Sequence, residues 1–102
     1  MEKVMIGGVE YAPVKASGNV RIVILQRGWV MVGKFERNGS DCKLHNASVI
    51  RSWGTSKGLG ELAKGPTDST KLDPCHGKVE FDYLTVCATI ECEEKGWKEY
   101  LQ

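Results

Sequence analysis

The sequence lacks a long hydrophobic run, and this absence excludes a membrane-spanning helix. No uninterrupted apolar stretch is longer than the one from Ile22 to Leu25, whereas a spanning helix needs about 20 apolar residues. The first residues, 1–4, do not form the apolar region of a secretory signal, and no lipidation motif is visible. We therefore expect a cytoplasmic protein with no membrane contact.

An excess of charge of one sign is also missing. Lys and Arg number 14 against 13 Asp and Glu, which leaves a formal net charge of +1. Such a balance gives no electrostatic signature of nucleic-acid binding. Hydrophobic residues make up 41% of the 102 residues, enough to exclude a disordered chain. This length predicts one domain over 1–102.

Cysteine and histidine are few, and their spacing is not that of a typical metal site. In the cytoplasm the four cysteines should stay reduced. A zinc site is conceivable from a set of four residues; they are Cys42, Cys75, His76 and Cys92. No C-x2-C pair accompanies them, and half-buried thiols are the simpler interpretation. We expect neither a metal nor another cofactor.

Catalytic motifs are likewise absent. Neither G-x-S-x-G nor H-E-x-x-H occurs. Cys75 and His76 are adjacent, and consecutive side chains of an extended chain diverge, so they do not make a nucleophile–base pair. The acidic run of Glu91, Glu93 and Glu94 is typical of a solvated face. We expect a protein that is not an enzyme.

Runs of β-branched and aromatic residues predict a mainly antiparallel α+β fold. The expected pieces are a hairpin over 3–14 around Gly7-Gly8, a linker over 15–19, strands over 20–26, 29–36 and 42–53, and a last sheet region over 78–92. Asn38-Gly39 predicts a type I′ turn, and a break is possible at His45-Asn46. The pattern fits a small bent sheet or a barrel of SH3 or OB size.

Residues 54–77 differ in composition from the segments before them, because they are rich in glycine and proline. We expect one short helix over 58–64, with Leu59, Leu62 and Ala63 inward, and loop structure over 67–77. Along 84–92 the even positions are apolar, which predicts a half-buried strand that starts with Leu84. A C-terminal helix over 93–101 would turn Trp97 and Leu101 inward, although Gly96 weakens it.

The loop between the strand that ends near Trp53 and the short helix carries the clearest candidate site. Gly, Ser and Thr in such a loop present backbone N–H groups to an anion, and the start of a helix adds partial positive charge. Arg51 and Lys57 would bind phosphate, Trp53 would stack on a ring, and Thr55 and Ser56 would donate hydrogen bonds. The ligand-binding candidates are Arg51, Trp53, Thr55, Ser56, Lys57 and Gly58. The alternative is structural, with Trp53 as a core residue.

A nucleic-acid interface is a second kind of site. Small barrels bind nucleic acid through aromatic residues flanked by basic ones. Candidate residues for such a face are Trp29, Lys34, Phe35, Arg37, Lys43 and Arg51. Trp29 and Phe35 share a strand face with the apolar Met31, however, which favours the core for that face.

Two segments resemble a family of small phage and prophage accessory proteins. They are Val30-Met31-Val32-Gly33 and residues 46–63, where N-A-x-x-I-R leads to W-G-T-x-K-G-L-x-E-L-A. The likeness extends over residues 20–92 and continues into G-P-T. The family brings no established activity. It implies a phage-encoded protein that acts in the host cytoplasm.

Small phage proteins that lack catalysis commonly block bacterial defence. We expect a protein that sequesters an anionic, nucleotide-like signalling molecule at the loop from Trp53 to Gly58. The alternatives are a protein–protein inhibitor of a host defence complex, as anti-CRISPR proteins are, a nucleic-acid-binding small barrel, and a virion or assembly accessory. Self-association into a homo-oligomer is expected, because so short a chain has a limited core and several edge strands.

Overall fold

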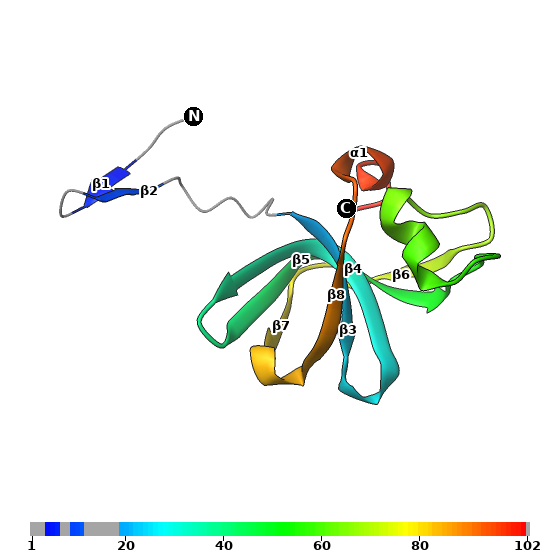
Figure 1. The fold of residues 1–102 in the computed structure, drawn as a ribbon, viewed down its shortest axis with the longest axis horizontal. Helices are drawn as coiled ribbons and strands as arrows, with labels where there is room; N and C mark the ends of the chain where they lie inside the picture. The colour runs from blue at the N-terminus through cyan, green and yellow to red at the C-terminus, as the bar shows by residue number, and fades with distance from the viewer. Residues whose placement is uncertain (1–3, 7–8, 12–18, 102) are drawn as a thin grey trace.

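The computed structural model describes residues 4–6, 9–11 and 19–101. Its body is a six-stranded antiparallel sheet in the order β6-β5-β4-β3-β8, with β7 also paired with β5 (Figure 1). The strands are β3 (Val20–Leu25), β4 (Trp29–Asn38), β5 (Asp41–Ser52), β6 (Lys71–Pro74), β7 (Val79–Asp82) and β8 (Val86–Glu91). Among the described residues β8 does not pair with β6 or β7, so the sheet is strongly bent but open. This confirms the bent-sheet expectation; a closed barrel is not formed.

The meander β3–β4–β5 follows the sequence prediction closely. Leu25 pairs with Trp29 across the short 3-10 turn η1 (Gln26–Gly28). Asn38 pairs with Asp41, so Gly39 and Ser40 are the central residues of the next turn. Gly39 alone of these two has a positive φ, of 65°. That is the pattern of a type II′ turn, and the predicted type I′ turn centred on Asn38-Gly39 is wrong.

A β-bulge replaces the break that we allowed at His45-Asn46. Val32 pairs with Ser48 but Lys34 pairs with His45, so two residues of β5 lie opposite Gly33. Asn46 takes a φ of 54° there, a conformation that asparagine tolerates better than most residues. The extra residue resets the alternation, so that Leu44 and Ala47 lie in one core cluster. Without the bulge, one of them would face the opposite side of the sheet.

The two faces of the bent sheet bury two separate clusters. The first is built on buried side chains of the face that the short helices cover: Val20, Ile22, Val32, Ile50, Leu62 and Trp97. The second fills the opposite face with Val23, Met31, Leu44 and Ala47. Because neighbouring residues of β3 contribute to both clusters, this strand is apolar almost throughout, as predicted for a strand covered on both faces.

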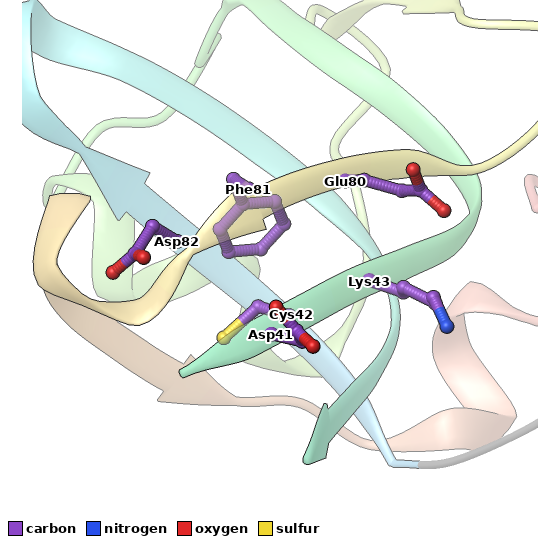
Figure 2. Close-up of a pocket in the computed structure, with 6 residues that line it drawn as sticks. All are labelled: Asp41, Cys42, Lys43, Glu80, Phe81 and Asp82. Atoms are coloured by element: carbon purple, nitrogen blue, oxygen red, sulfur yellow. The ribbon is translucent and has the colours of Figure 1, made fainter. Parts of the chain in front are cut away.

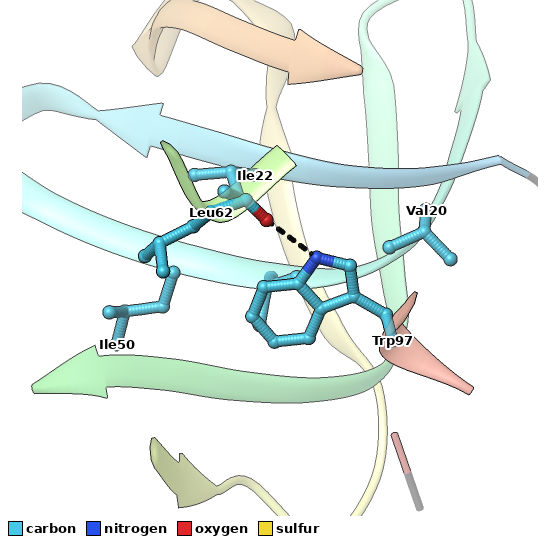
Figure 3. Close-up of a cluster of buried hydrophobic side chains, with 6 residues drawn as sticks. Val20, Ile22, Ile50, Leu62 and Trp97 are labelled. Carbon is cyan, nitrogen blue, oxygen red and sulfur yellow. Dashed lines mark hydrogen bonds between the residues drawn. The ribbon is translucent and has the colours of Figure 1, made fainter. Parts of the chain in front are cut away.

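Two short helical segments cap the first cluster. They are the 3-10 helix η2 (Leu59–Lys64) and the helix α1 (Glu94–Trp97). The Trp97 side chain is fully buried, and its Nε1 donates to the Leu62 carbonyl oxygen at 2.8 Å (Figure 3). Trp97 and Leu101 do face the core, as expected, but α1 is shorter than the predicted helix over 93–101.

Gly96 brings α1 against the end of η2. A Cβ atom on Gly96 would lie 1.8 Å from the Lys64 carbonyl oxygen, and one on Gly65 would lie 2.7 Å from the Gly96 carbonyl oxygen. The glycine that weakens the helix in isolation is therefore required by the contact between the two caps.

The chain between η2 and the C-terminus differs most from the sequence prediction. Residues 71–74, expected to be loop, form β6 and pair with β5. The strand expected from Leu84 starts at Val86, because Tyr83–Thr85 form the 3-10 turn η3. The pairing of β8 with β3 shifts register between the partners of Ile24 and Leu25. Because of this bulge, the even-numbered apolar residues of β8 do not all face the same side of the sheet. Val86 packs against the second cluster and Ile90 against the first.

The N-terminal strands β1 (Val4–Ile6) and β2 (Val9–Tyr11) pair antiparallel as a sheet of their own, which confirms the predicted strand pairing. The Gly7-Gly8 turn and the linker over 15–19 fall outside the described residues, except for Asn19. In the part of the chain that is described, no helix has the length and apolar character to cross a membrane.

Candidate functional site

The loop from Trp53 to Gly58 does present backbone N–H groups to an anionic oxygen, and that oxygen belongs to the chain itself. The N–H groups of Ser56 and Lys57 donate to Oε1 of Glu61 at 3.2 and 2.9 Å. The Ser56 hydroxyl approaches the same atom at 3.4 Å. The loop thus contains the expected anion-binding N–H groups, but the Glu61 carboxylate already accepts their hydrogen bonds. An external phosphate would have to displace that carboxylate.

The other candidates around this loop are only partly brought together. Trp53 is 43% exposed, so it is not a core residue. Lys57 and Ser56 are exposed, while Thr55 and Gly58 are half-buried. Arg51 is paired with Asp73 on the neighbouring strand β6, with its Nε 3.0 Å from Oδ2.

The residues that we considered for a nucleic-acid face do not share one face. Phe35 packs in the second cluster, 6.3 Å from Phe81 between ring centroids. Arg37 stacks on the ring of Tyr83, with its guanidinium carbon 3.4 Å from the ring centroid. The strand alternation places Lys34 and Lys43 away from Phe35. No aromatic platform lined by free basic groups forms among these residues.

The four cysteines lie apart in the fold. Cys75 packs against the second cluster and Cys92 against the first, on opposite faces of the sheet. Burial raises the pKa of the Cys42 thiol, and it raises the pKa of Cys92 to about 11. Within residues 4–6, 9–11 and 19–101, no group of three His, Cys, Asp or Glu side chains is arranged to hold a metal ion.

A shallow hollow of about 460 Å³ lies along the β5–β7 ladder (Figure 2). Its lining residues come from paired positions of the two strands: Asp41, Cys42, Lys43, Glu80, Phe81 and Asp82. Lys43 faces Glu80, whereas Asp41 lies opposite Asp82. Its nucleophile, Cys42, is buried with a raised pKa, so this hollow does not provide an activated thiol.

A half-buried hydrogen bond between side chains links the strands beside the bulge. Nε2 of His45 donates to Oε1 of Glu36 at 2.7 Å. This hydrogen bond holds the pKa of the Glu36 carboxyl below its ordinary value. The pair links β4 to β5, and this structural role accounts for the contact without a role in ligand binding.

The two most exposed large apolar side chains of the described residues lie at turns between strands: Trp29 follows η1, between β3 and β4, and Leu84 lies in η3, between β7 and β8. Leu84 is 82% exposed and Trp29 is 55% exposed. Trp29 and Val86 both pair with Leu25, so β3 lies between Trp29 and the start of β8. Tyr83, beside Leu84, is also exposed. We call Trp29, Tyr83 and Leu84 the apolar end.

Sequence reasoning missed this feature because it assigned Leu84 to a half-buried strand. The signal was Asp82, whose Oδ1 accepts the N–H of Leu84 at 2.8 Å. An aspartate that bonds to the backbone two residues on favours a turn over a strand. The turn lifts Leu84 out of the sheet.

Comparison of the chain with protein-family models, with curated proteins and with solved structures found no match.

Proposed function

We propose that this protein is a non-catalytic binding module that contacts a protein partner through the apolar end. The 82% exposure of Leu84 on a turn, together with the half-exposed Trp29, is the observation that carries the proposal. Exposed apolar surface on a soluble protein often marks an interaction site. Tryptophan and tyrosine are also the side chains that most often dominate binding energy at protein interfaces.

The phage setting suggests which partner to consider first. The resemblance described above implies an accessory protein of a phage, and an inhibitor of a host defence complex binds its target without chemistry of its own. This role needs an exposed recognition surface and no catalytic group. We therefore propose a host defence protein as the partner of the apolar end.

The test compares immobilised variants in a bacterial lysate. One variant carries Trp29→Lys and Leu84→Lys together. Its control is Trp53→Lys, which alters an exposed tryptophan away from the apolar end. We expect a partner that the wild type and the control retain and that the double variant loses. Equal retention by all three proteins would refute the assignment.

Binding of an anionic, nucleotide-like molecule at the Trp53–Gly58 loop is the second candidate. It is favoured by the two N–H groups already directed at a carboxylate oxygen, next to the exposed side chains of Trp53 and Lys57. In this proposal the ligand's phosphate takes the place of the Glu61 carboxylate.

A thermal-shift screen against cyclic dinucleotides and trinucleotides, ADP-ribose and simple nucleotides tests the second candidate. A ligand present at about 100 times its Kd should add about 2.7 kcal/mol to the unfolding free energy. Glu61→Ala should strengthen the shift by freeing the two N–H groups, and Lys57→Ala should abolish it with little loss of stability. The absence of any shift, in wild type and Glu61→Ala alike, would exclude nucleotide sequestration.

A further inference from the structure

We infer that the partner of the apolar end binds as an added β-strand along the outer edge of β8, with apolar residues near Leu84 and basic residues near Glu91. This inference rests on the proposed function, because it assigns the partner's shape and chemistry. It concerns a different set of contacts, made by the backbone of β8.

The outer edge of β8 carries no described strand along Val86–Glu91, and just beyond it the N–H of Glu93 donates to the Ala63 carbonyl oxygen of η2 at 2.7 Å. Among the described strands, β8 pairs only with β3, and no strand lies on its other side. The opposite edge of the sheet is protected, because β6 carries Lys71 and Pro74 and β7 alternates acidic residues. β8 has the sequence Val-Cys-Ala-Thr-Ile-Glu, without proline or a basic residue. It is also longer than β6 or β7.

The backbone of β8 directs hydrogen-bonding groups outward at known positions. The N–H of Cys92 donates to the carbonyl oxygen of Val20 at 3.0 Å, toward β3. Backbone groups alternate along an antiparallel ladder, so Thr89 and Glu91 turn their N–H and C=O groups away from β3. The bulge of this ladder lies nearer the start of β8, and Ala88 to Glu91 keep a continuous register with β3.

The two ends of this edge differ in chemistry, and this difference defines the partner. At one end lie the exposed carboxylates of Glu91, Glu93 and Glu94, with Arg21 on the inner neighbour β3. At the other end lies the exposed Leu84. An antiparallel partner strand would therefore carry lysine or arginine near its N-terminus and a large apolar residue near its C-terminus.

The same polarity argues against a second copy of this chain as the occupant. Antiparallel self-pairing of β8 would set the acidic end of one copy beside the apolar end of the other. Neither the charges nor the apolar side chains would then be matched across the interface. A different segment satisfies both ends at once.

The experiment uses a fluorescein-labelled peptide with two N-terminal lysines, a threonine–valine alternation and a C-terminal leucine. Fluorescence anisotropy measures its affinity for the full chain. Two control peptides have the same composition in reverse order, or glutamates in place of the lysines. We expect each control to bind at least about fivefold more weakly. Equal binding of all three peptides would overturn the assigned polarity.

Variants of the protein locate the site. Thr89→Pro removes an outward N–H that the β3–β8 ladder does not use, and it should weaken the peptide about tenfold. Glu91→Lys should weaken the lysine peptide and strengthen the glutamate peptide. Glu80→Lys, which reverses an exposed charge on the opposite edge, should change neither. Circular dichroism checks that each variant is folded, and the charge reversal at Glu91 keeps the test decisive if Thr89→Pro does not fold.

Backbone amide chemical shifts decide between the possible outcomes. Peptide-induced changes along residues 86–91 support strand addition. Changes confined to the apolar end would overturn it and leave the proposed function standing. Self-association of the wild type that Thr89→Pro abolishes would also overturn it, since a second copy would then occupy the edge.

Discussion

Substitution of Gly96 by alanine separates the preference of an isolated helix from the demand of the tertiary contact. In a helix, alanine is about 0.5–1 kcal/mol more favourable than glycine. In this protein the new Cβ would lie 1.8 Å from the Lys64 carbonyl oxygen and 2.7 Å from its carbonyl carbon. These are backbone atoms of η2, so a rotamer change of Lys64 cannot relieve the contact.

The cost follows from what must move. Displacement of α1 from η2 lengthens the hydrogen bond from Trp97 Nε1 to the Leu62 oxygen, which is 2.8 Å in the native structure. Overpacking of a core typically costs about 1–3 kcal/mol, and a weakened buried hydrogen bond adds about 1 kcal/mol. After the helix gain is subtracted, we expect Gly96→Ala to lower the free energy of unfolding by about 1–3.5 kcal/mol.

Urea unfolding, followed by circular dichroism, measures this change. The control is Gly60→Ala, because Gly60 lies in η2, where an added Cβ has no atom within 4 Å. We expect the control to be neutral or slightly stabilised. If Gly96→Ala is as stable as Gly60→Ala, the close contact between α1 and η2 does not exist as described.

Three further predictions concern single contacts. Trp97→Phe removes the indole N–H and should cost about 2 kcal/mol in urea unfolding, through a lost buried hydrogen bond and lost volume. The hydrogen bond from His45 holds the folded-state pKa of Glu36 below its ordinary value of 4.5. The contact therefore adds stability at pH values above 4.5, and this stability is lost as the pH falls through the folded-state pKa. Acid titration of Glu36→Gln should show a smaller loss than wild type. With a thiol reagent at neutral pH, the exposed Cys87 should react at least about tenfold faster than Cys92, whose pKa is raised to about 11 by burial; equal rates would contradict the burial of Cys92.

Local sequence predicted the parts of the fold whose residues interact with near neighbours. β3 is rich in β-branched residues, β4 and β5 are the longest strands, and turns at Arg27-Gly28 and Gly39 join the three. Their pairing is local, so alternation and turn residues suffice to predict it. The inward direction of Leu62 and Trp97 followed from their spacing in short helical segments.

For the candidate site, the sequence predicted which residue types the loop contains but not which partners they bind in the structure. The sequence indicates a loop whose N–H groups can bind an anion, and the structure contains that loop. It does not indicate that Glu61, four residues beyond Lys57, supplies the anion. It also does not indicate that Arg51 is paired with Asp73, because 22 residues separate them.

The sequence by itself therefore determined the strands of the meander and the chemical character of the loop. Only the tertiary structure decided that Lys71–Pro74 is a strand, that Leu84 stands in solvent and that Gly96 is a contact. β6 owes its extended form to pairing with β5, and Gly96 owes its role to a carbonyl 32 residues away in the sequence, that of Lys64. Such effects arise between segments that no local pattern connects, because burial and steric contact depend on where the chain returns.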